Sequence, residues 1–271
     1  MRTTEIPLLG QAAIMGVVNV TPDSFSDGGL FDDSPAAIAH GLTLFAEGAD
    51  LVDVGGESTR PGASAVTADE ELERVQPVVA RLAEAGPVSI DTSKAEVAAA
   101  AITVGAEVIN DVTSLSDPAM ADVAAAGGVG LVLMHMQGTP RTMQEDPQYT
   151  DVVEEVTAYL VDRARIAEEA GVDPSKISID PGIGFGKSVR HNVELLANLD
   201  RLVATGYTVT LGTSRKRFLG ALTGIEVAAD RDPATAATVA LAVAAGVAVL
   251  RVHNVAMGLQ AARTASAIVF G

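Results

Sequence analysis

The chain has 271 residues, of which 48% are hydrophobic and 20% are charged, and it contains neither cysteine nor tryptophan. This length predicts one large domain, which we place over residues 1–271. The formal net charge of -17 disfavours binding to nucleic acids and to anionic membranes. The lack of cysteine excludes a disulfide framework, a thiolate zinc site and a cysteine nucleophile.

The N-terminal stretch, Met1 to Gln11, lacks the apolar core of a signal peptide. No stretch reaches the roughly 18 consecutive apolar residues of a membrane-spanning helix. We therefore expect a cytoplasmic protein with no membrane partner and no nucleic-acid partner. The average electrostatic field of this acidic protein repels anions. An anionic ligand would therefore need a few cationic side chains positioned at its binding site.

Short apolar runs rich in valine and isoleucine alternate with longer, alanine-rich stretches of helical period. This alternation predicts repeated strand–helix units. Helix caps are expected at Ser34, Ser93 and Asp117, and glycines such as Gly86 are expected to end helices in a left-handed conformation. Eight strands are expected, at Ala13–Asn19, Leu51–Gly55, Val88–Asp91, Val108–Asp111, Gly130–His135, Ile177–Asp180, Val209–Thr213 and Val249–His253.

Eight such units in this length predict an α/β fold, a single-domain (β/α)8 TIM barrel, with a doubly wound open sheet as the alternative. Barrel enzymes place their chemistry at the carboxyl ends of the strands. Each predicted strand here closes on polar residues, which a closed ring would bring to one mouth. These residues are Asn19, Asp53, Asp91, Asn110, Asp111, His135, Asp180, Ser214, Lys216, Arg251 and His253.

Cations near the end of the chain suggest where an anion would bind. Arg251 and His253 alternate along the eighth strand and point toward a helix that starts near Asn254, which predicts a phosphate-binding corner. The alternative is a buried arginine packed under the barrel and a histidine with satisfied hydrogen bonds. The run Ser214–Arg217 holds three cations at a strand end, which favours a ligand contact over a solvated helix start.

Asp91, Asn110 and Asp180 end strands three, four and six, and their side chains suit a planar ligand with several N–H donors. Metal binding by the same carboxylates is the competing interpretation. Two glycine-containing segments, Thr21–Gly29 and Gly55–Gly62, are expected to approach a ligand closely. Phe25 and Arg60 lie on these segments, and both are expected to fold over the ligand.

Eight motifs, in order along most of the chain, resemble the dihydropteroate synthase family. They are NVTPDSFSDGG (19–29), GGESTRPGA (55–63), IDTSK (90–94), NDV (110–112), MHMQGTPRTMQ (134–144), DPGIGFGK (180–187), SRKRFLG (214–220) and RVHN (251–254). The first, second and seventh motifs are the most diagnostic. One departure is Asn254, where the family usually has aspartate, and this exchange concerns the cap of the final helix.

The resemblance implies a transferase of folate biosynthesis on a pterin-binding TIM barrel. The amine of 4-aminobenzoate would displace pyrophosphate from 6-hydroxymethyl-7,8-dihydropterin diphosphate to give 7,8-dihydropteroate. It also implies Mg2+ held by Asn19 and the phosphate oxygens, a homodimer in which the final helices supply a face, and a sulfonamide target. Its implied catalytic residues are Asn19, Asp91, Lys216, Arg251 and His253.

The resemblance also assigns the binding residues. The pterin would contact Asp91, Asn110, Met134, Asp180, Phe185, Gly212, Lys216 and Arg251. The 4-aminobenzoate site and its loops would use Phe25, Asp27, Thr59, Arg60, Pro61, Phe185, Ser214 and Lys216. The diphosphate would meet Asn19, Arg251 and His253.

Two other functions remain open from the sequence. A pterin-dependent methyltransferase barrel would share the acid and amide contacts, but it has no use for SRKRFLG or for a pyrophosphate corner. A catalytically silent relative would bind a pterin or a protein through the same mouth, yet Phe25, Asp27, Thr59, Arg60 and Pro61 are all present. For the synthase, the polarity of the residues suggests a dissociative displacement, in which the rate depends mainly on stabilising the leaving group.

Overall fold

The strands form a closed parallel barrel, as predicted. The computed structural model describes residues 12–20, 34–58, 66–139 and 142–271. The sheet closes because β1 pairs with β8, in register from Ala13 with Val249 to Gly16 with Val252, which excludes the open sheet. In chain order the strands are β1 (Ala13–Asn19), β2 (Leu51–Gly55), β3 (Val88–Asp91), β4 (Val108–Asp111), β5 (Gly130–Met134), β6 (Ile177–Asp180), β7 (Thr208–Leu211) and β8 (Val249–Val252).

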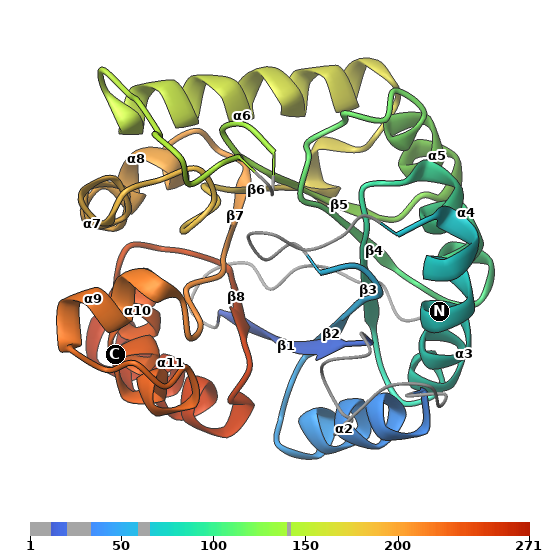
Figure 1. Cartoon of the computed structure of the whole chain (residues 1–271), viewed down its shortest axis with the longest axis horizontal. Coiled ribbons are helices and arrows are strands. Elements are labelled where there is room, and N and C mark those ends of the chain that lie inside the picture. Colours follow the sequence, from blue (N-terminus) through green and yellow to red (C-terminus); the bar gives the residue numbers. More distant parts are fainter. Residues whose placement is uncertain (1–11, 21–33, 59–65, 140–141) are drawn as a thin grey trace.

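Helices surround the strands on the outside, and Figure 1 shows this ring around the barrel. Among the described residues, no helix is both long enough and apolar enough to cross a membrane. The α-helices are α2 (Ser34–Ala46), α3 (Ala68–Ala83), α4 (Ala95–Thr103), α5 (Met120–Gly127), α6 (Val152–Glu169), α7 (Val189–Ala197), α8 (Leu199–Val203), α9 (Arg217–Thr223), α10 (Asp232–Ala244) and α11 (Val255–Phe270). Two short 3-10 helices, η1 (Pro174–Lys176) and η2 (Ala229–Arg231), precede β6 and α10.

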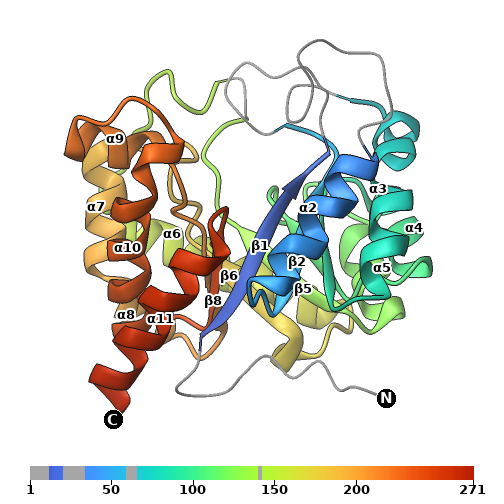
Figure 2. The same cartoon turned by 90° about the horizontal axis from the view of Figure 1, so that it is seen from below.

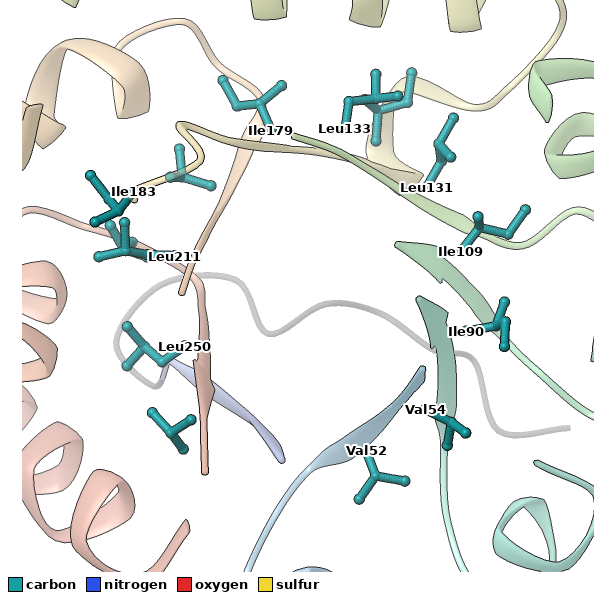
Figure 3. Close-up of a cluster of buried hydrophobic side chains, with 14 of the residues drawn as sticks. Val52, Val54, Ile90, Ile109, Leu131, Leu133, Ile179, Ile183, Leu211 and Leu250 are labelled. Carbon is teal, nitrogen blue, oxygen red and sulfur yellow. The ribbon is translucent and has the colours of Figure 1, made fainter. Parts of the chain in front are cut away.

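The main hydrophobic core lies between the strands and the helices. Ile90, Ile109 and Leu131 point outward from their strands into this layer, as Figure 3 shows. All three are fully buried, and each such side chain contributes about 1.5–3 kcal/mol to folding. The apolar cluster of Ala13, Met15 and Val249 lies on the opposite, inward faces of β1 and β8, near their amino ends.

Three local predictions about helix ends were wrong. Ser93 does not cap α4: Lys94 occupies the N-cap position, and the Asp117 Oδ2 accepts a hydrogen bond from Ala95 N at 2.9 Å. Asp117 is not the N-cap of α5 either, because that helix begins after Ala119. Gly86 is not among the glycines with a left-handed backbone. Glycine is needed there because a Cβ would lie 2.7 Å from the Phe45 ring.

Candidate active site

Polar side chains from several strands face the inside of the barrel at its carboxyl end. Successive residues of a strand point to opposite faces, so Asp53, between the outward-facing Val52 and Val54, points inward. The same alternation applies on the other strands. By this alternation six further side chains point inward: Asn19, Asp91, Asn110, Met134, Asp180 and Arg251.

Arg251 joins two of the acids at the centre of this mouth. Its Nε donates to Asp53 Oδ2 at 2.6 Å, and its Nη2 donates to Asp91 Oδ2 at 2.9 Å. Asn110 Nδ2 donates to the same Asp53 oxygen at 3.0 Å. One buried carboxylate therefore orients both the guanidinium and the amide, each from a different strand. The arginine is thus partly exposed to the mouth and is not simply packed under the barrel.

Burial sets the protonation of the ionisable groups in the mouth. Burial, and after it the charge of Asp53, raises the pKa of Asp91 to about 7, although Arg251 opposes the shift. Burial also raises the pKa of Asp180 and lowers the pKa of Lys216 to about 8. Near neutral pH the Asp91 carboxyl group can therefore donate or accept a proton in a hydrogen bond, which suits a ligand edge that carries both donors and acceptors.

Lys216 and Phe185 form one wall of the mouth. The Lys216 Nζ lies 4.7 Å from the centroid of the Phe185 ring and donates a hydrogen bond to the carbonyl of Ile183. At Gly212, an added Cβ would come within 3.9 Å of the Lys216 Nζ and within 3.7 Å of the Arg251 Cβ. A side chain at position 212 would therefore occupy the space beside these two cations, which the glycine leaves free.

The predicted anion corner joins the segments that follow β7 and β8. Ser214 Oγ lies 2.9 Å from His253 Nδ1 and accepts a hydrogen bond from His253 N at 3.0 Å. Asn254 is the N-cap of α11 and accepts from Met257 N at 3.0 Å. Asn254 Nδ2 also donates to Asp232 Oδ2 at 3.0 Å, a bond that aspartate at this position could not donate when ionised.

Four of the polar residues expected at the mouth serve other roles. Arg215 has a left-handed backbone (φ 60°) and makes a bidentate ion pair with Asp232, at 2.7 and 2.8 Å, while Arg217 is exposed at the start of α9. Only Lys216 of the three cations faces the mouth. Asp111 is occupied with backbone N–H groups of the loop after β4, and His135 packs edge-on against Tyr159.

Five predicted residues, on the segments after β1 and β2, lie outside the described residues: Phe25, Asp27, Thr59, Arg60 and Pro61. In the part of the chain that is described, no group of three or more acidic or histidine side chains could hold a metal ion. Asn19 stands at the end of β1 and is partly exposed, so one amide oxygen is available there. This fits a magnesium ion whose other ligands are substrate phosphates and water, because Mg2+ commonly keeps several waters.

One central residue was left out of the predicted site. Asp53 lies near the end of the second strand in the pattern Val-Asp-Val, which marks it as a polar strand end and assigns it no role. It is fully buried, and its Oδ1 has no hydrogen-bond partner. An acid between two β-branched residues of a buried strand was the available signal, since such an acid needs a partner inside the barrel.

Comparisons with known proteins show which family the chain is similar to. The family model described as "Pterin binding enzyme" matches residues 15–253. Dihydropteroate synthase of Mycobacterium leprae is 48% identical over 96% of this chain and 94% of its own. Dihydropteroate synthase of Xanthomonas albilineans with 4-aminobenzoic acid is 50% identical, with a TM-score of 0.90 over 95% of this chain and 93% of that one. The Xanthomonas enzyme in complex with 7,8-dihydropteroate is 47% identical, with a TM-score of 0.88 over 97% and 95% of the two chains.

The fold and the mouth thus define a pterin-binding enzyme built on a TIM barrel. Identities of this level over almost the whole chain decide the family within that class. The chain belongs to the dihydropteroate synthase family, as its motifs predicted.

Proposed function

We propose that the mouth of this barrel joins 6-hydroxymethyl-7,8-dihydropterin diphosphate to 4-aminobenzoate, giving 7,8-dihydropteroate and pyrophosphate. The observation that carries this function is the meeting of Asp91, Asn110, Asp180, Lys216 and Arg251 at one end of a closed barrel. Two acids and an amide suit the amino-pyrimidine edge of a pterin, and the cations suit its diphosphate. Related enzymes with 4-aminobenzoic acid and with 7,8-dihydropteroate support the same assignment.

The pterin ring is placed deep in the mouth. Asp180 and Asn110 hold its amino-pyrimidine edge, Asp91 and Lys216 complete the polar contacts, and Arg251 stacks on the ring. Met134, Phe185 and Gly212 line the slot on either side of the ring. The burial of Asn110 and Asp180, each 5% exposed, supports a site in which water competes little for these hydrogen bonds.

The 4-aminobenzoate lies nearer the entrance, among Phe185, Ser214 and Lys216. We retain Phe25, Asp27, Thr59, Arg60 and Pro61 as predicted residues of this subsite. Sulfonamides imitate 4-aminobenzoate, so we expect them to compete for the same place.

In the reaction a bond forms between the amine nitrogen and the pterin methylene carbon, and the bond from that carbon to the diphosphate oxygen breaks. The amine loses one proton, and pyrophosphate leaves. An aryl amine is neutral near pH 7, so no strong base must precede its attack. The limiting demand is the negative charge that develops on the leaving oxygen. Arg251 and His253, with the amides that begin α11, are placed to stabilise that charge in a dissociative displacement.

We assign Asn19 as the side chain that would hold Mg2+ together with the diphosphate oxygens. When bound, the ion would supply positive charge against the diphosphate. Replacing Asn19 by alanine would then raise the Mg2+ concentration needed for half-maximal rate, which a titration of the rate against Mg2+ measures. An unchanged Mg2+ requirement would remove Asn19 as a ligand.

We further propose a single domain over residues 1–271, a cytoplasmic location and a homodimer formed through the final two helices. The net charge of -17 supports small-molecule substrates over nucleic acid. Figure 2 shows α10 and α11 side by side on one flank of the barrel. Between them lies an open groove of about 490 Å³ with a mostly apolar lining, which includes Leu241, Met257, Ile268 and Val269. Exposed apolar side chains in one groove favour contact with a second copy.

Release of pyrophosphate tests the function. The purified protein should release pyrophosphate only when both substrates are present, and the product should be dihydropteroate by mass. Turnover of methyltetrahydrofolate without pyrophosphate release would favour a methyltransferase. Binding of the pterin without any turnover would indicate a silent relative.

A further inference from the structure

The loop between β6 and α7 (residues 181–187) is wedged against the chain that follows β5. Gly182 and Gly186 both have left-handed backbones, with φ of 64° and 60°. A Cβ on Gly182 would lie 1.8 Å from the carbonyl oxygen of His135, and a Cβ on Gly186 would lie 2.4 Å from that of Gln137. Glycine is therefore required at both positions, and the two backbones are in direct contact.

Three consecutive carbonyl groups of this loop, those of residues 184–186, each accept a hydrogen bond from a side chain. Gln144 Nε2 donates to the first at 2.6 Å, Lys187 Nζ donates to the second at 2.9 Å, and Tyr149 Oη donates to the third at 2.8 Å. Loop carbonyls at a barrel rim are free to bond water, so three side-chain donors in a row hold this backbone in one place.

Lys187 is the least expected of these donors because it is only 3% exposed. Besides the Phe185 carbonyl, its Nζ meets the His135 carbonyl at 3.3 Å and the His135 Nδ1 at 2.9 Å. Within the described residues no carboxylate lies at ion-pair distance from it. Burial lowers the pKa of Lys187 well below its ordinary value, and burial lowers the pKa of His135 to about 3. The Lys187 amine thus contacts three polar groups, two backbone carbonyls and the imidazole Nδ1, and it links the loop to the chain that follows β5.

The loop that is held in this way carries part of the mouth. The Phe185 ring faces the Lys216 Nζ at 4.7 Å, and the Ile183 carbonyl accepts from the same amine. A displacement of the loop would therefore move the Phe185 ring together with the Ile183 carbonyl that accepts from Lys216. Phe185 and Lys216 both belong to the proposed 4-aminobenzoate subsite.

We propose that Tyr149 and Lys187 are positioning residues for the condensation, because they fix the loop carbonyls that set where the Phe185 ring stands beside 4-aminobenzoate. This inference rests on the proposed role of Phe185 in that subsite. Neither residue touches a substrate. Replacing either residue should raise the KM for 4-aminobenzoate more than the KM for the pterin diphosphate. A general loss of stability would not separate the two KM values in this way.

Tyr149→Phe removes only the hydroxyl group. We expect the KM for 4-aminobenzoate to rise about tenfold. Phe185 also lines the pterin slot, but the pterin keeps its hydrogen bonds to Asn110 and Asp180 on the strands, so the KM for the pterin diphosphate should rise less than about twofold. The matched control is Tyr207→Phe, because Tyr207 Oη donates to Glu168 Oε1 at 2.6 Å and lies just before β7, at the other end of the barrel. The control should leave both KM values unchanged. Equal rises of both KM values in Tyr149→Phe, or no rise, would overturn the proposal.

Crystal structures give a readout that does not depend on turnover. In Tyr149→Phe combined with Lys187→Met, we expect the Phe185 backbone to move by about 1 Å or more while the strands stay in place, a shift large enough to impair alignment. If the double variant does not fold, the structure of Tyr149→Phe alone decides by the same comparison. An unmoved Phe185 refutes the positioning role. Failure of the wild-type protein to release pyrophosphate would instead refute the proposed function, and the crystallographic comparison would still stand.

Discussion

Replacing Asp53 by asparagine removes the negative charge around which the mouth is arranged. The Asp53 side chain is fully buried, and its Oδ2 accepts hydrogen bonds from Arg251 at 2.6 Å and from Asn110 at 3.0 Å. Asparagine has the same shape and can keep one accepting oxygen. It leaves the guanidinium with Asp91 as its remaining acidic partner, at 2.9 Å.

The size of the effect follows from this geometry. Removing one partner of a buried ion pair costs about 3–5 kcal/mol when the other charge is left alone. Because Arg251 keeps Asp91, and because the asparagine oxygen still accepts, we expect a loss of about 2–3 kcal/mol in the free energy of unfolding. Urea unfolding measures it. Asp50→Asn is the matched control, since Asp50 accepts from Ile14 N near the amino end of the barrel.

Catalysis should change in a way that stability alone does not explain. The charge of Asp53 contributes, after burial, to raising the pKa of Asp91 to about 7. Its removal should lower that pKa, so the ionisation that we expect near pH 7 in the wild-type profile of kcat/KM should move to lower pH in the variant. Turnover should fall because Arg251 and Asn110 lose their common anchor. A variant with wild-type turnover and an unmoved profile would refute the electrostatic reasoning, provided that Asp50→Asn behaves like the wild type.

Four further predictions test other parts of the molecule. Arg251→Ala should lower turnover about a hundredfold or more while the far-ultraviolet circular dichroism stays native, because a donor to the leaving oxygen is lost; near-normal turnover would remove the mechanism. The raised pKa of Asp91 means that the native state holds a proton that the unfolded chain releases from about pH 4 upward, so stability should fall as the pH rises toward 7. Urea unfolding across that range should show less of this fall in Asp91→Asn, and an equal fall in both proteins would contradict the shift. Asn254→Asp should lower the free energy of unfolding at pH 7 by about 1–2 kcal/mol, since its carboxylate would face Asp232 Oδ2 where the amide now donates at 3.0 Å; thermal unfolding with an unchanged midpoint would count against this. Leu241→Glu, in the groove between α10 and α11, should shift sedimentation from dimer to monomer, and a dimer that persists would move the interface elsewhere.

The strands were predictable because of their burial. A parallel barrel strand is covered on its outer face by helices, so it appears as a short apolar run, and five of the eight strands have the predicted bounds. The other three differ at their ends. There the chain leaves the regular pairing, although His135 N still donates to the Asp180 carbonyl at 2.9 Å, one residue beyond the end of β5.

Side-chain direction within polar clusters was not predictable in the same way. The run Ser214–Arg217 presents three cations, and the sequence offers no reason to separate them. A left-handed backbone at Arg215 turns its guanidinium to Asp232, on α10, and Lys216 is left to face the mouth. The position of His135 at a strand end predicts a place at the mouth, but its ring packs against Tyr159 of α6 instead.

The sequence by itself determined the period of the strands and helices, the polar residue at each strand end and the motifs of the family, because these depend on neighbours in the chain. Only the tertiary structure decided which charges neutralise one another. Arg251 meets Asp53 across 198 positions of sequence, and Asp91 across 160. Such pairs form when closure of the barrel brings distant strands together, and their protonation follows from burial that no local stretch of sequence encodes.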